Sequence, residues 1–148
     1  SVARGLARRY APNNNQELQM PLARIEVRKN WPAEKQQFLI QALHAAMLEA
    51  LKIPERDKQI RFVEHRPEHF AVPPEATENY TLVELSMFPG RSLEAKRNLY
   101  QGIVKRFGEI GIEPNDIFIV LNEVPRENWG IRGGVPASEV DLGFKINV

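Results

Sequence analysis

The chain presents one order of predicted elements twice, and this repeat constrains its fold more than any other feature of the sequence. In the first unit, residues 22–28 alternate apolar and charged side chains, the period of two that is typical of a half-buried strand. Between Pro32 and Pro54, apolar side chains recur at three- and four-residue steps and predict an amphipathic helix. A second strand is predicted over residues 60–64. The first unit is therefore strand, helix, strand.

The second unit repeats this order about sixty positions later. A strand is predicted over residues 80–88, followed by a helix that begins near Ser92, a typical N-cap residue, and stops at Gly111. The unbroken apolar run of residues 117–121 predicts a last strand that is covered on both faces. The turns before the two closing strands also correspond, because each ends in an aspartate, Asp57 or Asp116. This correspondence indicates an internal duplication.

Two tandem strand-helix-strand units predict an α+β fold in which both units share one sheet. Each unit forms a right-handed crossover, so the simplest assembly is a four-stranded mixed sheet with both helices on one face. Two helices cannot cover the opposite face, although the last strand is predicted to be covered on both sides. We therefore expect self-association through the open face, as a dimer or a trimer.

The first twenty residues differ in composition from the rest of the chain. They contain three arginines and a polar run of asparagine and glutamine, but few large apolar side chains. We expect residues 1–20 to be a disordered or non-native extension; a targeting peptide and a structured tail are the alternatives. A single domain is expected over residues 21–148, beginning directly after Met20.

Charge and composition exclude several functional classes. Residues 21–148 carry 17 basic and 18 acidic side chains, with no clustered basic face, so we expect no nucleic-acid partner. No apolar run approaches the roughly eighteen residues of a membrane span, and we expect no membrane partner. The sequence has no cysteine, which excludes thiolate chemistry and fits a cytoplasmic protein. Pro67 breaks the helical spacing between His65 and His69, so we expect neither a metal nor a cofactor.

Pro21 is the residue on which the expected chemistry depends. If Met20 is the initiator and is removed, Pro21 carries a free secondary amine held rigid by its ring. A chain-terminal amine titrates near pKa ~8, and burial or a nearby guanidinium lowers this pKa toward neutrality, where the amine acts as a general base. If the preceding residues are retained, the nitrogen is an amide without basicity, and Pro21 simply opens a strand.

Several of these features together resemble the tautomerase superfamily. They are the Met20-Pro21 pair, the two tandem units, and two signatures, Phe88-Pro89-Gly90-Arg91-Ser92 and Asn128-Trp129-Gly130-Ile131-Arg132-Gly133. The resemblance covers residues 21–148 and is greatest for long-chain members that fuse two units, in particular the malonate semialdehyde decarboxylases. It implies a homotrimer built around three packed sheets and a catalytic amino-terminal proline, which Pro21 matches.

The resemblance also implies roles for other residues. Asp57 matches a water-activating aspartate by its distance from the proline, and Arg91 matches one arginine of a carboxylate-binding loop. His65 lies in a segment similar to one found in the decarboxylases. Trp129 and Arg132 lie in a closing loop that the resemblance places near the pocket of a neighbouring subunit. The expected catalytic residues are thus Pro21, Arg91 and Asp57, and the expected substrate-binding residues are Arg91, Trp129, Arg132 and His65.

One departure from the family pattern bears on the reaction. The other arginine of the carboxylate-binding loop is absent, and Met87 or Phe88 takes its place. We therefore expect an isomerase in which Pro21 is the general base for keto-enol conversion of a small carboxylate-bearing 2-oxo acid. The first alternative is a decarboxylase or hydratase, with cationic Pro21 as general acid and Asp57 activating water. The others are a non-catalytic binding or structural protein with a blocked Pro21, and a ferredoxin-like binding module.

Overall fold

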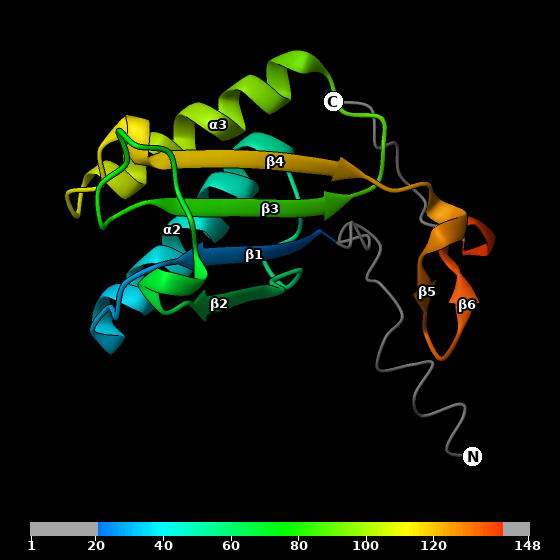
Figure 1. Ribbon diagram of the computed structural model, residues 1–148. Coiled ribbons are helices and arrows are strands. Elements are labelled where there is room, and N and C mark those ends of the chain that lie inside the picture. The colour runs from blue at the N-terminus through cyan, green and yellow to red at the C-terminus, as the bar shows by residue number, and fades with distance from the viewer. Residues whose placement is uncertain (1–20, 141–148) are drawn as a thin grey trace.

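The computed structural model describes residues 21–140 and shows a four-stranded sheet with two long helices packed on one face (Figure 1). The first unit consists of β1 (Leu22–Val27), α2 (Ala33–Leu51) and β2 (Ile60–Glu64). The second consists of β3 (Thr81–Met87), α3 (Leu93–Gly108) and β4 (Ile117–Glu123). The extension predicted at residues 1–20 and the last residues, 141–148, lie outside the described part.

The two units lie side by side in the sheet, whose strand order is β2-β1-β3-β4. β1 and β2 are parallel, as are β3 and β4, whereas the central strands β1 and β3 are antiparallel. Since one helix connects each parallel pair, each unit is a β-α-β crossover. The mixed sheet, the two tandem units and the position of both helices on one face are therefore confirmed.

The hydrophobic core lies between the sheet and the helix layer. Alternate residues of β1 and β3 point toward the helices, and Ile25 and Leu85 at the centre of these strands are fully buried. Large apolar side chains of both helices meet them and are also fully buried, among them Leu39, Leu43, Met47, Leu99, Ile103 and Phe107. Removing this apolar surface from water is the main force that holds the two units on one sheet.

The helix ends differ from the predicted ends by a few residues. Pro32 is the N-cap of α2, and Lys52 closes the helix in the left-handed conformation, with φ 56°. The predicted cap of α3 is confirmed, because the Ser92 hydroxyl accepts a 3.1 Å hydrogen bond from the Ala95 N–H. α3 ends at Gly108, before the predicted stop at Gly111. Within residues 21–140, neither helix is long and apolar enough to cross a bilayer.

The sheet surface that faces away from the helices, called the open face below, has neither α2 nor α3 packed on it within residues 21–140 (Figure 1). Phe118 of β4 belongs to this face and is 56% exposed, so the apolar run of β4 is covered on one side only. Arg24 lies at the centre of the open face between two carboxylates, with Nε 3.2 Å from Glu26 and Nη2 3.4 Å from Glu84. The open face is thus partly apolar and crossed by a short row of paired charges.

Beyond β4, the chain forms a small closing segment at one end of the sheet (Figure 1). Its hairpin consists of β5 (Gly130–Ile131) and β6 (Val135–Pro136). A second buried cluster supports it, made of Phe88, Ile131, Ala137 and Val140, with Trp129 packed against it. The Arg126 guanidinium donates to the carbonyls of Ala137 and Val140 at 3.5 and 3.4 Å. These contacts attach the closing segment to the end of the sheet where β3 and β4 finish.

Candidate active site

Pro21 lies buried at the end of the sheet where β1 begins. Because β1 is antiparallel to β3, with Leu22 opposite Ser86, Pro21 adjoins the carboxyl end of β3. The chain leaves β3 at this end and turns at Gly90, whose φ of 123° favours glycine, before it reaches Arg91. Strand pairing therefore brings Pro21 and Arg91, which are far apart in the sequence, to the same end of the sheet.

Arg91 is a buried cation, with 6% of its surface exposed. It directly precedes Ser92, the N-cap of α3, where the helix dipole disfavours a positive charge. Burial lowers the pKa of the Arg91 guanidinium, and the charge of Glu123 partly opposes this shift. A guanidinium held away from bulk water at a helix N-terminus is suited to bind a small carboxylate, since the anion gains both a bidentate partner and the helix dipole.

Asp57 reaches the same end of the sheet from the side of β2. Its backbone N–H donates to the carbonyl of Pro54 at 3.0 Å, which closes the turn before β2. The N–H of Ala23 donates to the carbonyl of Gln59 at 2.9 Å, so this turn runs alongside the start of β1. Asp57 is 7% exposed. All three residues predicted to be catalytic thus gather at one end of the sheet.

The second unit lacks this combination of residues. By strand register, Thr81 takes the position in the second unit that Pro21 has in the first. Asp116, the counterpart of Asp57, accepts hydrogen bonds from the Thr77 backbone N–H at 2.9 Å and from the Thr77 hydroxyl at 2.5 Å. Its carboxylate therefore holds the loop before β3 in place. The candidate site therefore combines Pro21 and Asp57 of the first unit with buried Arg91, which precedes α3 in the second unit.

His44, a residue of α2 with no role predicted above, supports the turn that carries Asp57. It lies on α2, is 8% exposed, and is hydrogen-bonded to the backbone of Glu55 within this turn. Burial, and to a smaller extent the charge of Lys58, lower the pKa of His44, while the bond to Glu55 opposes the shift. A lone histidine on a helix gives no sequence signal for such a role, because its partner lies on a separate turn.

A fall in pH is expected to destabilise the fold through His44. Its pKa is lower in the fold than the ordinary 6.5, so neutral His44 stabilises the protein above pH 6.5, and this contribution is lost as the pH falls through the lowered value. His44→Gln keeps an amide that donates to the Glu55 carbonyl but does not titrate. Its thermal midpoint should therefore fall less between about pH 7 and about pH 5 than that of the unaltered protein. His69→Gln, at an exposed site, is the control, and equal pH dependence in all three proteins would contradict this role.

His65 lies at the opposite end of the sheet from Pro21. Its backbone N–H donates to the carbonyl of Val27 at 2.8 Å, where the parallel strands β1 and β2 both end. The His65 ring has Nε2 2.8 Å from Glu26 Oε1 and packs edge-on against Phe70, with 5.3 Å between the ring centroids. Within one chain, His65 is not brought to Pro21, so a role in substrate binding requires a second subunit.

Trp129 and Arg132 belong to the closing segment, at the same end of the sheet as Pro21. Trp129 Nε1 donates to the carbonyl of Val124 at 3.0 Å, and its ring meets Phe88 edge-on at 5.4 Å between centroids. Arg132 has a left-handed φ of 47° in the hairpin turn, and its buried Nε and Nη2 find no hydrogen-bond partner within residues 21–140. The same residues contain no cluster of three or more His, Asp or Glu side chains with the geometry of a metal site.

Comparison with known families agrees with this geometry. A family described as "Tautomerase enzyme" matches residues 57–132, which is about half of the chain, and a second family with the same description matches residues 21–79. The chain belongs to the tautomerase family. The second match begins at Pro21, and the two matches together cover both β-α-β units and the start of the closing segment.

Individual relatives of this tautomerase-family chain are distant. A Bacillus subtilis (strain 168) protein named "Probable tautomerase YusQ" is 27% identical over 121 residues, which are 78% of this chain and 95% of the relative. A crystal structure of FG41 malonate semialdehyde decarboxylase inhibited by 3-bromopropiolate has a TM-score of 0.68 and 24% identity, covering 73% of this chain and 86% of that one. A symmetric trimer of wild-type fused 4-OT has a TM-score of 0.69 and 21% identity, covering 79% and 96%. These structures share the α+β fold described above.

Proposed function

We propose that this chain is an isomerase that interconverts the keto and enol forms of a small 2-oxo acid, with Pro21 as its general base. The proposal requires Pro21 to be the amino-terminal residue of the mature protein, so that its nitrogen is a secondary amine. Arg91 would bind the substrate carboxylate and stabilise the enolate. The observation that carries the proposal is that buried Pro21, from the first unit, and buried Arg91, from the turn before α3 in the second unit, lie at the same end of the sheet.

The protonation state of Pro21 decides which reaction the site supports. A terminal amine has a pKa near ~8, and both burial and the positive charge of Arg91 disfavour its protonated form. The neutral amine would remove a proton from the carbon next to the carbonyl. The electron pair of that C–H bond forms a C=C bond, and the carbonyl oxygen becomes an enolate. The proton then passes from Pro21 to the enolate oxygen, which gives the enol and regenerates the amine.

Decarboxylation or hydration of a small oxo acid is the second candidate, because the buried carboxylate of Asp57 lies at the same end of the sheet and would favour cationic Pro21. One feature of the structure argues against decarboxylation. It concerns the positions where the loop of a decarboxylase is expected to carry a second arginine. Met87 and Phe88 occupy these positions, are 0% exposed and belong to the hydrophobic clusters. No second guanidinium is therefore available there to hold the carboxylate that would leave.

Asp57→Asn separates the two candidates. For an isomerase that uses neutral Pro21, the enol-keto conversion of phenylpyruvate should change by less than about ten-fold, because Asp57 takes no part in the proton transfer. If Asp57 instead activates water, the rate of malonate semialdehyde turnover should be more than about a hundred-fold lower in Asp57→Asn than in the unaltered protein. Detectable malonate semialdehyde turnover in the unaltered protein that is lost in Asp57→Asn would support the second candidate instead.

The proposal is tested first by the intact mass of the protein purified from its native host. A mass that begins at Pro21 meets the requirement for a free amine. A mass that includes any residue before Pro21 refutes both catalytic candidates and leaves a non-catalytic binding or structural protein. With Pro21 terminal, enol-keto conversion of phenylpyruvate is then compared with turnover of malonate semialdehyde. We place the reaction in the cytoplasm, a location that the cysteine-free sequence permits.

We further propose that the chain assembles as a homotrimer through its open face. The fused 4-OT neighbour with the same fold is a symmetric trimer. In the present chain, exposed Phe118 and the apolar neighbours of the open face need a cover, and the helix layer lies on the other side of the sheet. Assembly through this face would also bury the charges on Arg24, Glu26 and Glu84, which are already paired with one another.

Arg24→Ala is expected to weaken this assembly. In this variant the carboxylates of Glu26 and Glu84 lose the cation that they share. Assembly through the open face would then remove two charges from water without Arg24 to pair with them, which is unfavourable. We expect the dissociation constant of the trimer to rise at least about ten-fold, measured by sedimentation over a range of concentrations. Arg97→Ala removes an exposed cation from α3, where Arg97 pairs with Glu94 at 2.8 Å, and is the matched control. If both variants assemble as tightly as the unaltered chain, the open face is not the interface.

A further inference from the structure

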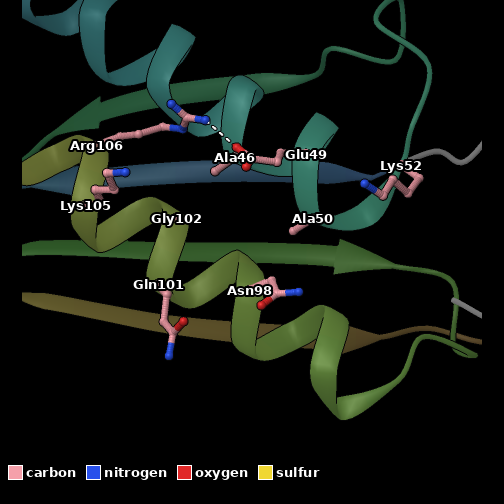
Figure 2. Close-up of a pocket in the computed structure, with 9 residues that line it drawn as sticks. All are labelled: Ala46, Glu49, Ala50, Lys52, Asn98, Gln101, Gly102, Lys105 and Arg106. Carbon is pink, nitrogen blue, oxygen red and sulfur yellow. Dashed lines mark hydrogen bonds and ion pairs between the residues drawn. The ribbon is translucent and has the colours of Figure 1, made fainter.

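A polar groove runs between α2 and α3 on the side of the helix layer that faces away from the sheet (Figure 2). Its volume is about 430 Å³. The lining residues come from facing stripes of α2 and α3 and from the C-cap of α2, with small side chains below and charged or amide side chains around them: Ala46, Glu49, Ala50, Lys52, Asn98, Gln101, Gly102, Lys105 and Arg106. None of these residues belongs to the candidate active site.

The floor of the groove is apolar and made of small residues. Ala46 and Ala50 of α2 are almost completely buried, and they face Gly102 of α3. A Cβ atom at Gly102 would lie 3.5 Å from the Ala46 Cβ, an ordinary van der Waals contact, so the helices approach closely along this line. The lining residues of α3 span two helical turns, a length of roughly 10 Å. The floor is therefore a narrow apolar strip bounded by the polar side chains of the two helices.

Two cations stand at opposite ends of this floor (Figure 2). Glu49 and Arg106 neutralise each other through a 2.6 Å ion pair across the groove. The ammonium groups of Lys52 and Lys105, in contrast, make no hydrogen bond or ion pair within residues 21–140. Since α2 and α3 run antiparallel, Lys52 and Lys105 lie roughly 10–15 Å apart along the helix axes.

The positive charge of the groove is a local feature. The groove is lined by three basic side chains and one acidic side chain, whereas residues 21–140 as a whole carry 16 basic and 17 acidic ones. Asn98 and Gln101 add amide groups that can donate hydrogen bonds to an anion. A ligand for this groove should therefore carry negative charge at both ends, near Lys52 and Lys105.

We propose that the groove binds a small, elongated dianion of the dicarboxylate type. One carboxylate would lie at Lys52 and the other at Lys105, and the unbranched middle would lie on the floor of Ala46, Ala50 and Gly102. The groove is on the helix side of the chain, so it stays accessible when subunits associate through the open face. Binding here does not depend on the chemistry of Pro21.

The straight-chain dicarboxylate suberate is a suitable probe, titrated into the ¹⁵N-labelled full chain and followed by NMR. We expect shifts of the Gly102 and Lys105 amide resonances. Suberate should bind at least about ten-fold more tightly than octanoate, which lacks the second carboxylate, or malonate, which is too short to reach both ends. Binding at Arg91 is followed separately through the Gly90 and Ser92 resonances, so that a failure of the proposed function and a failure of the groove site are distinguishable.

The charge requirement is tested with the Lys52→Gln/Lys105→Gln double variant. Its affinity for suberate should fall at least about ten-fold, whereas Lys35→Gln, in the exposed first turn of α2, should bind as the unaltered chain does. Equal affinities for suberate and octanoate in the unaltered chain would overturn the proposal, and this comparison needs no variant to fold. Shifts confined to the surroundings of Arg91, or undiminished binding in a folded double variant, would overturn it as well.

Discussion

Pro21→Ala, in a chain that begins at residue 21, is expected to lower kcat for the enol-keto conversion of phenylpyruvate by about a hundred-fold or more, with little change in KM. Alanine leaves a primary amine, which rotates freely and is better solvated than the ring nitrogen of buried Pro21. Its pKa is therefore expected to lie closer to the ordinary value of about 8, and less of it is neutral and correctly oriented near pH 7. The measurement is a steady-state rate as a function of pH.

A chain that retains Met20 is the matched control for this variant, because its Pro21 ring is unchanged but its nitrogen is an amide. We expect its activity to fall to the background rate. Both proteins should unfold at the same temperature as the active chain, since Pro21 precedes β1 and donates no hydrogen bond to the sheet. Rates in Pro21→Ala within about two-fold of the unaltered chain would remove Pro21 from the mechanism.

Arg91→Ala is expected to lower kcat/KM for phenylpyruvate by about 10²–10³-fold. Arg91 is the buried cation at the Pro21 end of the sheet, so its loss removes both the partner of the substrate carboxylate and a positive charge that stabilises the enolate. The kcat/KM of Arg91→Lys should lie between those of the unaltered protein and of Arg91→Ala, because an ammonium group keeps the charge but cannot form the bidentate pair. The measurement is kcat and KM for phenylpyruvate and for its methyl ester.

The ester makes the assignment specific to carboxylate binding. The unaltered protein should strongly prefer the acid over the ester, and Arg91→Ala should lose most of this preference. Arg97→Ala, an exposed arginine of α3 paired with Glu94, is the matched control and should keep it. A full preference for the acid in folded Arg91→Ala would show that another group holds the carboxylate.

The fold was largely predictable because its signals are local. The alternation in β1, the helical spacing of apolar residues in α2 and the matching turn aspartates predicted two β-α-β units, and the structure confirms them. The boundaries were less predictable, since Gly108 ends α3 where the sequence placed the stop at Gly111. The local sequence pattern also did not predict how β4 is covered in the single chain, where Phe118 on one of its sides is exposed.

The candidate site was predictable in its members but not in its geometry. Pro21, Asp57 and Arg91 were selected by residue type and resemblance, whereas their gathering at one end of the sheet rests on the antiparallel pairing of β1 with β3. His65 is the clearest difference. The parallel pairing of β1 and β2 places it at the far end of the sheet, where it pairs with Glu26. His44 was missed because its partner lies on another turn.

By itself, the sequence determined the two β-α-β units, the proline that opens the first of them and the family to which the chain belongs, because periodicity and turn residues act within a few positions of the chain. Only the tertiary structure decided that the two turn aspartates differ. Asp116 is held by Thr77, and Asp57 lies beside the start of β1. The tertiary structure also decided that Lys52 and Lys105 lie at the two ends of one groove, because α2 and α3 pack side by side on a common core. Such contacts join residues far apart in the chain, and they exist only once the core has formed.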